Sequence, residues 1–194
     1  MNFITQALMV SMLLVVDNGS VFTPSISKIL LKNKIDFSII NFDQITSLDL
    51  TKFDAFILSG RRKNEQKMNA INSEIINHVI SEKKSLLGIC YGAEILALTL
   101  GGTIRKSQSV VKGIHTVNVK LSNSLCSHKD IRAYQSHSYE IAKLGTKLEN
   151  FATSDTCQYE IIKHKTLPIF GTQFHPEMSK DGQLLIESFL KIIH

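Results

Sequence analysis

The sequence predicts an α/β fold, with a mixed, largely parallel sheet flanked by helices. Short apolar runs alternate with amphipathic segments between residues 13 and 102, which is typical of right-handed β-α-β units and a parallel sheet. From residue 103 the pattern changes to short extended segments separated by polar turns, which predicts antiparallel strands added to the sheet. One more apolar run and an amphipathic helix close the chain. With 194 residues and 43% hydrophobic side chains, the chain can bury a full core as one domain.

In the first half, we expect buried strands at residues 13–16, 37–40, 53–58 and 86–89. A helix is predicted to start near Pro24 and to close near Asn33, because proline is favoured in a first helical turn. A second helix is expected along residues 71–80, where isoleucine and valine recur at helical spacing. A third runs from Ala93 to Gly101, and a glycine pair at residues 101–102 ends it.

In the second half, we expect strands near residues 116–119, 131–134, 151–153, 159–163 and 169–173. A C-terminal helix is predicted from the spacing of apolar residues between 184 and 193. Residues 1–12 are expected to form a loose N-terminal extension, and residues 13–194 the domain. Met9 and Met12 are alternative starts of the chain.

Composition and charge exclude several classes of function. The net charge is +5, but the basic residues are dispersed and are not interleaved with aromatic ones, so we expect no nucleic-acid partner. The apolar N-terminal stretch is interrupted by Gln6 and Ser11 and follows no basic residue, which fits neither a signal peptide nor a membrane span. Three widely spaced cysteines, at positions 90, 126 and 157, predict no metal pair, no disulfide framework and a reducing cytoplasmic location. We expect no cofactor.

Cys90 lies on a predicted strand-to-helix turn, between glycines at positions 88 and 92. A turn this sharp strains its central residue and brings neighbouring backbone close, which glycine permits. The turn places the thiol at a helix N-terminus, where the partial positive charge favours the thiolate. This is the cysteine counterpart of a nucleophile elbow. Taken alone, the pattern is also that of a structural cysteine beside packing glycines.

His175 and Glu177 follow the last predicted strand, in the sequence Q-F-H-P-E at residues 173–177. Pro176 favours an extended histidine, and residues i and i+2 of an extended chain face the same side. The carboxylate could then orient the imidazole toward a thiol, which is the arrangement for nucleophilic acyl transfer. Alone, this motif is more typical of a surface loop with a turn proline, but the two motifs together favour catalysis.

Four predicted strand ends carry polar or reactive residues, at positions 17–19, 59–60, 90 and 175. Because sites in open α/β sheets form beyond the carboxyl ends of the strands, we expect these residues to surround one crevice.

The motifs at residues 88–92 and 173–177, in this order and spacing, resemble those of the class I glutamine amidotransferases. The similarity spans nearly the whole chain and includes residues 17–19, 57–60 and 163–169. The resemblance implies a seven-stranded-type mixed sheet in a flavodoxin-like three-layer fold. It also implies hydrolysis of glutamine to glutamate and ammonia, with the ammonia passed to a synthase partner that uses ATP.

By this resemblance, Cys90 attacks the side-chain amide of glutamine, His175 moves protons and Glu177 orients His175. The backbone N–H of Tyr91 is a candidate oxyanion donor, and the loop at Gly60 and Arg61 is expected to supply a second. The backbone around three residues is expected to hold the amino-acid end of the substrate; these are Ser136, Ser138 and Tyr139.

Within the family, residues 90–92 and 155–158 look most like glutaminase subunits of GMP synthetase, as found in archaea. Residues 17–23 and 112–113 resemble anthranilate synthase glutaminase subunits. We favour the first resemblance.

Two residues depart from the family pattern. Arg61 stands where relatives usually carry a glycine, and a positive φ there would cost an arginine about 1 kcal/mol or more. Glu94 stands where relatives usually carry glutamine, and it could pair with Arg61. Three functions stay open: a glutaminase subunit, a hydrolase of another γ-glutamyl compound, and a non-catalytic regulatory member. The intact Cys90, His175 and Glu177 count against the third.

Overall fold

A computed structural model describes residues 12–120, 124–126 and 129–193. Most of the predicted N-terminal extension, residues 1–11, lies outside the described part. Met12 is described, and its backbone N–H donates to Asp54 Oδ2 at 3.1 Å. Among the described residues, no helix is long and apolar enough to cross a membrane.

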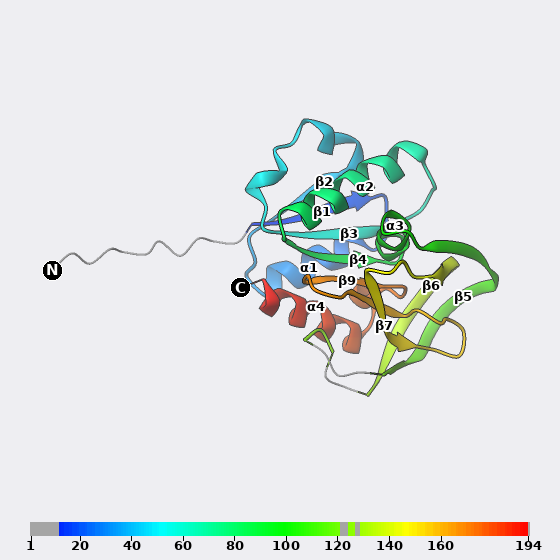
Figure 1. The fold of residues 1–194 in the computed structure, drawn as a ribbon. Coiled ribbons are helices and arrows are strands. Elements are labelled where there is room, and N and C mark those ends of the chain that lie inside the picture. Colours follow the sequence, from blue (N-terminus) through cyan, green and yellow to red (C-terminus); the bar gives the residue numbers. More distant parts are fainter. Residues whose placement is uncertain (1–11, 121–123, 127–128, 194) are drawn as a thin grey trace.

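The described strands form one mixed sheet of nine, in the order β2-β1-β3-β4-β9-β8-β7-β5-β6 (Figure 1). The pairings from β2 to β9 are parallel, and those from β9 to β6 are antiparallel. This confirms the predicted mixed sheet and the change of pattern at residue 103. The sheet has nine strands, two more than the seven-stranded type that the resemblance implies. The strand bounds are β1 Leu13–Asn18, β2 Phe37–Asn41, β3 Ala55–Arg61, β4 Ser85–Ile89, β5 Thr103–Val119, β6 Asp130–Lys143, β7 Leu148–Thr153, β8 Ile161–His164 and β9 Ile169–Thr172.

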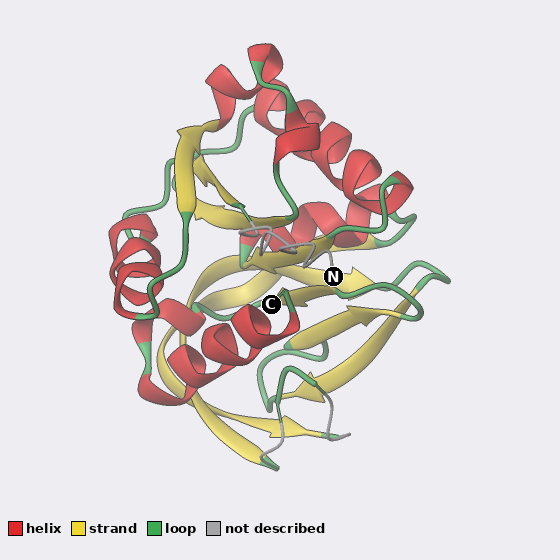
Figure 2. Cartoon of the chain, turned by 90° about the vertical axis from the view of Figure 1, so that its left-hand side faces the viewer, coloured by secondary structure: helices red, strands yellow, loops and turns green. Residues whose placement is uncertain are grey.

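Helices cover both faces of the sheet (Figure 2). Along β1, Leu13 and Val15 pack with α1 and α4, whereas Leu14 and Val16 pack with α2 and α3. This alternation follows from the two faces of a strand and gives the three layers expected. The helix bounds are α1 Thr23–Lys32, α2 Gln66–Ser81, α3 Tyr91–Thr99 and α4 Lys180–Ile192, with 3₁₀ helices η1 Phe42–Ser47, η2 Leu50–Lys52 and η3 Pro176–Met178.

Strands β5 and β6 differ most from the prediction. The sequence predicts short extended pieces, but these strands have 17 and 14 residues and pair along most of their length. Only two residues of β5, Val111 and Val117, are buried. Because one face of such an antiparallel pair is solvated, its hydrophobic signal is weak and the strand ends are hard to read from the sequence.

The parallel strands β1, β3, β4 and β9 run side by side, so their carboxyl ends meet at one edge of the sheet. Asn18, Gly60, Cys90 and His175 lie at or just beyond these ends. The sheet therefore brings together the four predicted segments, which are far apart in the sequence.

Candidate active site

Cys90 occupies a strained turn between β4 and α3. Its backbone has φ 51° and ψ −102°, in a region that costs a non-glycine residue about 1–3 kcal/mol. A Cβ on Gly88 would lie 2.5 Å from the backbone of Gly92, so only glycine fits this approach. The Cys90 N–H donates to the carbonyl of Thr172 at 2.7 Å, which ties the turn to β9. The predicted nucleophile elbow is confirmed as a backbone geometry.

His175 and Glu177 are brought together by a turn. His175 Nδ1 lies 2.9 Å from Glu177 Oε1, and the two side chains are 4% and 0% exposed. Only His175 is extended, with φ −98° and ψ 92°, because Glu177 already lies in the 3₁₀ helix η3. The predicted pairing is present, but the expectation that both residues share a face of an extended chain is wrong.

The His175 imidazole faces the Cys90 thiol, with which it shares a side-chain hydrogen bond. Burial lowers the pKa of His175, but the negative charge of Cys90, the hydrogen bond to it and the contact with Glu177 together raise this pKa to about 10. The raised pKa favours a charged imidazolium at His175, directly beside the Cys90 thiol. Cys90 is only 8% exposed, and it lines a cavity.

Gly60 and Phe22 fix the place of the His175 ring. A Cβ on Gly60 would lie 2.9 Å from His175 Cε1, so a side chain at residue 60 would push the ring away. The Phe22 ring meets the imidazole edge to face, with 4.7 Å between their centroids. Gly60, which the resemblance predicts as an oxyanion-loop residue, therefore makes room for the His175 ring.

A buried amide network holds the ends of β1 and β3 together. The Asn18 N–H donates to Ser59 Oγ at 2.9 Å, and Asn18 Nδ2 donates to the Ser59 carbonyl at 3.1 Å. Asn72 of α2 pairs with the Asn18 side chain through two hydrogen bonds of 2.8 and 3.2 Å. Sequence reasoning placed residues 17–19 at the site but missed Asn72, whose only signal is a polar side chain on the apolar face of a helix.

A cavity of about 200 Å³ opens onto Cys90. Most of the predicted substrate-binding residues line it, whereas Gly60, His175 and Glu177 are not part of the lining. The lining residues are Arg61, Arg62, Lys63, Asn64, Cys90, Tyr91, Glu94, Ser136, His137, Ser138 and Tyr139.

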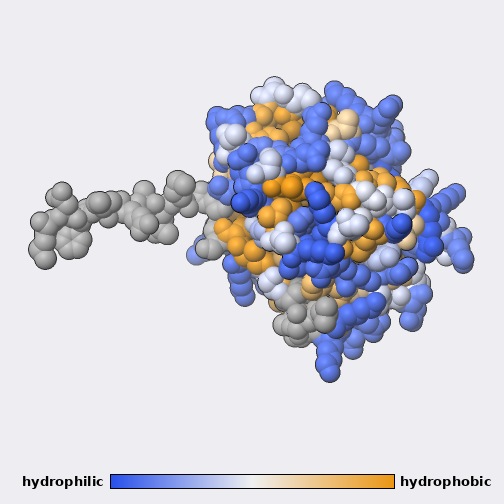
Figure 3. Space-filling model, in the orientation of Figure 1, coloured by the Kyte–Doolittle hydropathy of each residue, from blue (hydrophilic) through white to orange (hydrophobic). Residues whose placement is uncertain are grey.

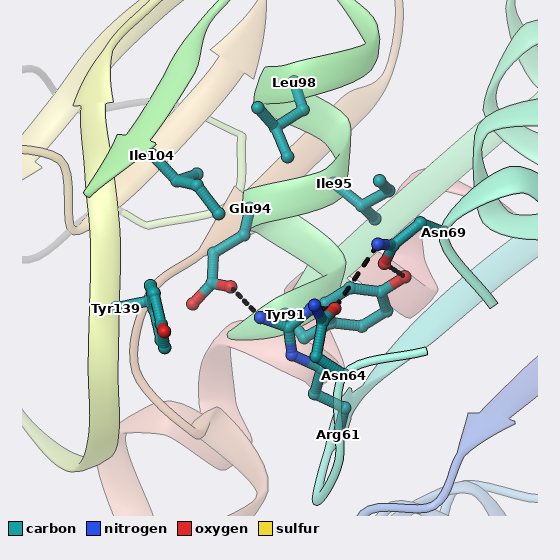
Figure 4. A pocket seen from close by; sticks show the side chains of 9 residues that line it. All are labelled: Arg61, Asn64, Asn69, Tyr91, Glu94, Ile95, Leu98, Ile104 and Tyr139. Atoms are coloured by element: carbon teal, nitrogen blue, oxygen red, sulfur yellow. Dashed lines mark hydrogen bonds and ion pairs between the residues drawn. The ribbon is translucent and has the colours of Figure 1, made fainter. Parts of the chain in front are cut away.

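Arg61 and Glu94 form an ion pair across the cavity wall, with 3.4 Å between Nη2 and Oε2. Figure 4 shows the Arg61 side chain between Glu94 and Asn64, where Nη1 donates to Asn64 Oδ1 at 2.6 Å. The guanidinium also lies 4.4 Å from the centroid of the Tyr91 ring. The predicted pairing is confirmed. This wall also borders a second cavity of about 130 Å³, lined partly by Ile95, Leu98 and Ile104.

The expected backbone strain at Arg61 is wrong. Arg61 is not among the described non-glycine residues with positive φ, which are Lys34, Lys83 and Cys90. It is instead the last residue of β3 and forms an antiparallel bridge with Gly19. An arginine fits here because the strand continues through the position where a glycine turn was expected.

Gln173 joins three parts of the site, a role that sequence reasoning missed. Its Nε2 donates to Glu94 Oε1 at 3.2 Å and to the Tyr139 carbonyl at 3.3 Å. Its Oε1 accepts from the Ile141 N–H at 3.3 Å. Burial raises the pKa of Glu94, which Arg61 and Gln173 oppose. The signal for this role was a glutamine within an otherwise apolar strand end, next to the catalytic motif.

Metal-binding side chains do not gather at this site. No group of three or more His, Cys, Asp or Glu residues among the described ones could hold a metal ion.

A strained cysteine, a buried histidine with its carboxylate and a polar cavity form the arrangement expected of a cysteine-dependent acyl-transfer site. The chain belongs to the class I glutamine amidotransferases: the family model described as glutamine amidotransferase class-I matches residues 14–192.

Among individual relatives, the chain is 30% identical to a subunit of the glutamine-hydrolyzing GMP synthase of Methanocaldococcus jannaschii, over 93% of this chain and 97% of that one. It is 31% identical to the corresponding GMP synthase subunit of Thermoplasma acidophilum, over 92% and 90% of the two chains. A crystal structure of a candidate GMP synthase subunit from Thermoplasma acidophilum has a TM-score of 0.85 at 29% identity, covering 95% and 94% of the chains.

Proposed function

We propose that this chain is the glutaminase subunit of a two-subunit GMP synthase. It hydrolyses glutamine to glutamate and ammonia through a thioester on Cys90 and supplies the ammonia to the synthase subunit. The observation that carries the proposal is the buried thiol–imidazole–carboxylate arrangement, with the 2.9 Å contact between His175 and Glu177. The relatives named as subunits of glutamine-hydrolyzing GMP synthases support the choice of substrate and partner.

In the first step, Cys90 Sγ attacks the side-chain amide carbon of glutamine and forms a C–S bond. The amide oxygen becomes an oxyanion, for which the Tyr91 N–H at the start of α3 is a donor. His175 gives its proton to the amide nitrogen, the C–N bond breaks and ammonia leaves. The product is a γ-glutamyl thioester on Cys90.

In the second step, a water molecule attacks the thioester while His175 takes its proton. The charge of Cys90 is the largest influence that raises the pKa of His175, and it disappears when the sulfur is acylated. Burial then favours the neutral imidazole, so the same residue can act as an acid first and a base second. Breaking the C–S bond releases glutamate, and the thiolate and imidazolium are restored.

The amino-acid end of glutamine is assigned to the wall opposite Cys90. This wall carries the Ser136–Tyr139 part of β6, together with Glu94 and Arg61. Backbone groups of β6 and the Glu94 carboxylate can hold the α-carboxylate and the α-ammonium groups. When the substrate enters, Glu94 must either separate from Arg61 or contact both Arg61 and the substrate.

The synthase subunit, which would bind ATP, is proposed to dock over the cavity mouth. Three large apolar side chains of β5 and β6 are exposed, namely Val110 at 67%, Ile114 at 45% and Tyr139 at 43%, and Tyr139 lines the cavity. Figure 3 shows apolar patches separated by hydrophilic side chains on one face of the molecule. Contiguous exposed apolar surface is typical of sites that pair with another protein.

The test is ammonia release from glutamine by the purified chain, alone and with the ATP-dependent synthase subunit of an archaeal GMP synthase. We expect Cys90-dependent release that rises when the partner is added. A screen of other γ-glutamyl amides in the same assay checks the substrate. Faster reaction with another γ-glutamyl compound, or no release in either condition, would contradict the proposal.

A further inference from the structure

A chain of buried polar side chains runs from the cavity wall to a turn at residues 154–158. Its centre is Glu160, which is 0% exposed. Glu160 Oε1 accepts from Gln135 Nε2 at 2.8 Å and from Ser154 Oγ at 2.6 Å. Burial raises the pKa of Glu160, so this carboxyl group is costly to keep inside the protein. The two proposed steps of hydrolysis use none of these residues.

At its inner end, this row of buried polar side chains reaches the wall of the catalytic cavity through His137. Gln135 Oε1 lies 3.1 Å from His137 Nε2, and His137 Nδ1 lies 2.9 Å from the Tyr139 carbonyl. The same carbonyl accepts a hydrogen bond from Gln173, so Tyr139 is held from two sides. His137 therefore fixes the β6 backbone that lines the same cavity as Cys90.

At its outer end, this row of buried polar side chains reaches a surface turn through Ser154. Ser154 Oγ donates to Glu160 and also accepts from the N–H groups of Thr156 and Cys157, at 3.2 and 3.0 Å. The turn is closed by a backbone bond from the Ser154 N–H to the Cys157 carbonyl at 2.8 Å. Its motif at residues 155–158 stood out in the sequence, but no catalytic step accounts for it.

The backbone supports the same connection. The Gln173 N–H donates to the Glu160 carbonyl at 2.9 Å, and the Glu160 N–H donates to Ala152 at 2.9 Å. Glu160 thus lies between the strand that carries the turn and the segment that carries His175. A displacement of Glu160 would therefore reach Gln173, which donates to Glu94 and to the Tyr139 carbonyl.

We propose that Ser154, Glu160, Gln135 and His137 act together as positioning residues for glutamine. They hold the Ser136–Tyr139 wall in the conformation that binds the amino-acid end of the substrate. The surface turn at residues 154–158 then determines glutamine affinity although it does not line the cavity. This inference rests on the proposed hydrolysis of glutamine at Cys90.

The test uses the full chain with the substitutions Ser154→Ala and Glu160→Gln. Each should raise KM for glutamine by about five- to tenfold, the effect expected when one buried hydrogen bond is lost, with kcat within about twofold. Protection of Cys90 from iodoacetamide by glutamine should weaken by the same factor, which measures occupancy of the site independently of ammonia release. Ser154→Thr keeps the hydroxyl group and should restore KM.

Gln158→Ala is the matched control, since this exposed side chain belongs to the same turn. It should leave KM unchanged. In addition, Ser154→Ala and His137→Ala should be non-additive in KM, because linked residues share one effect. Unchanged KM in both Ser154→Ala and Glu160→Gln, or independent effects in the double variant, would overturn the positioning role alone. Failure of the unaltered chain to hydrolyse glutamine would instead overturn the proposed function together with this inference.

Discussion

The two sides of the cavity are built in different ways. The reactive side contains Cys90, His175 and Glu177, and each is placed by the backbone of a short local segment. The binding side is built from side chains that come from distant segments, such as Arg61 of β3 with Glu94 of α3. From this comparison we expect local backbone geometry to set the chemistry and long-range side-chain contacts to set which substrate fits.

A single substitution on the reactive side should therefore abolish glutamine hydrolysis. Cys90→Ala removes the nucleophile, and we expect glutamine hydrolysis to fall by at least about 10⁴-fold, as for loss of a triad nucleophile. Steady-state ammonia release measures this loss. Cys126→Ala is the control, since Cys126 lines a separate cavity beside α4. Equal loss in both variants would mean that folding, and not the nucleophile, had been affected.

Glu177→Gln tests whether the carboxylate orients and charges the imidazole. Glu177 is buried against His175, so a neutral amide should lower kcat by about 10²–10⁴-fold while the fold is kept. The measurement is kcat and KM for glutamine. A variant as active as the parent would show that the carboxylate has no part in catalysis.

The charge of Cys90 should be visible in the titration of His175. In Cys90→Ala the pKa of His175 should fall well below about 10, because burial then outweighs the contact with Glu177. Since the folded pKa of His175 is raised, the charged imidazolium contributes stability that is fully present below pH 6.5 and is lost as the pH rises through about 10.

NMR titration of the imidazole and unfolding at several pH values measure these two effects. The free energy of unfolding of the parent, relative to Cys90→Ala, should decrease across this window. An unchanged imidazole pKa in the variant would contradict the thiolate–imidazolium pair.

Substitutions on the binding side should have smaller effects, which a second substitution can reverse. Arg61→Gly leaves the buried Glu94 carboxylate without its cation and should lower the free energy of unfolding by about 1–3 kcal/mol. Adding Glu94→Gln should recover most of this loss, because the amide needs no counter-ion. Denaturant unfolding of the single and double variants measures the effect. Additive losses would mean that the two residues are not coupled.

The same contrast explains how much the sequence could predict. The motifs around Cys90 and His175 were readable because glycine and proline report backbone geometry directly. The roles of Gln173, Asn72 and Glu160 were not, because each depends on partners dozens of residues away in the chain. Similarly, the short strands were well located, whereas the half-solvated β5 and β6 were much longer than their hydrophobic pattern indicated.

The central claim is that glutamine is cleaved through a covalent bond to Cys90. The most direct measurement is mass spectrometry of the chain quenched in acid during turnover with glutamine. We expect a γ-glutamyl adduct on the peptide that contains Cys90, absent from the Cys90→Ala variant. Ammonia release at the parent's rate by that variant, or turnover by the parent with the adduct on another residue, would contradict the account.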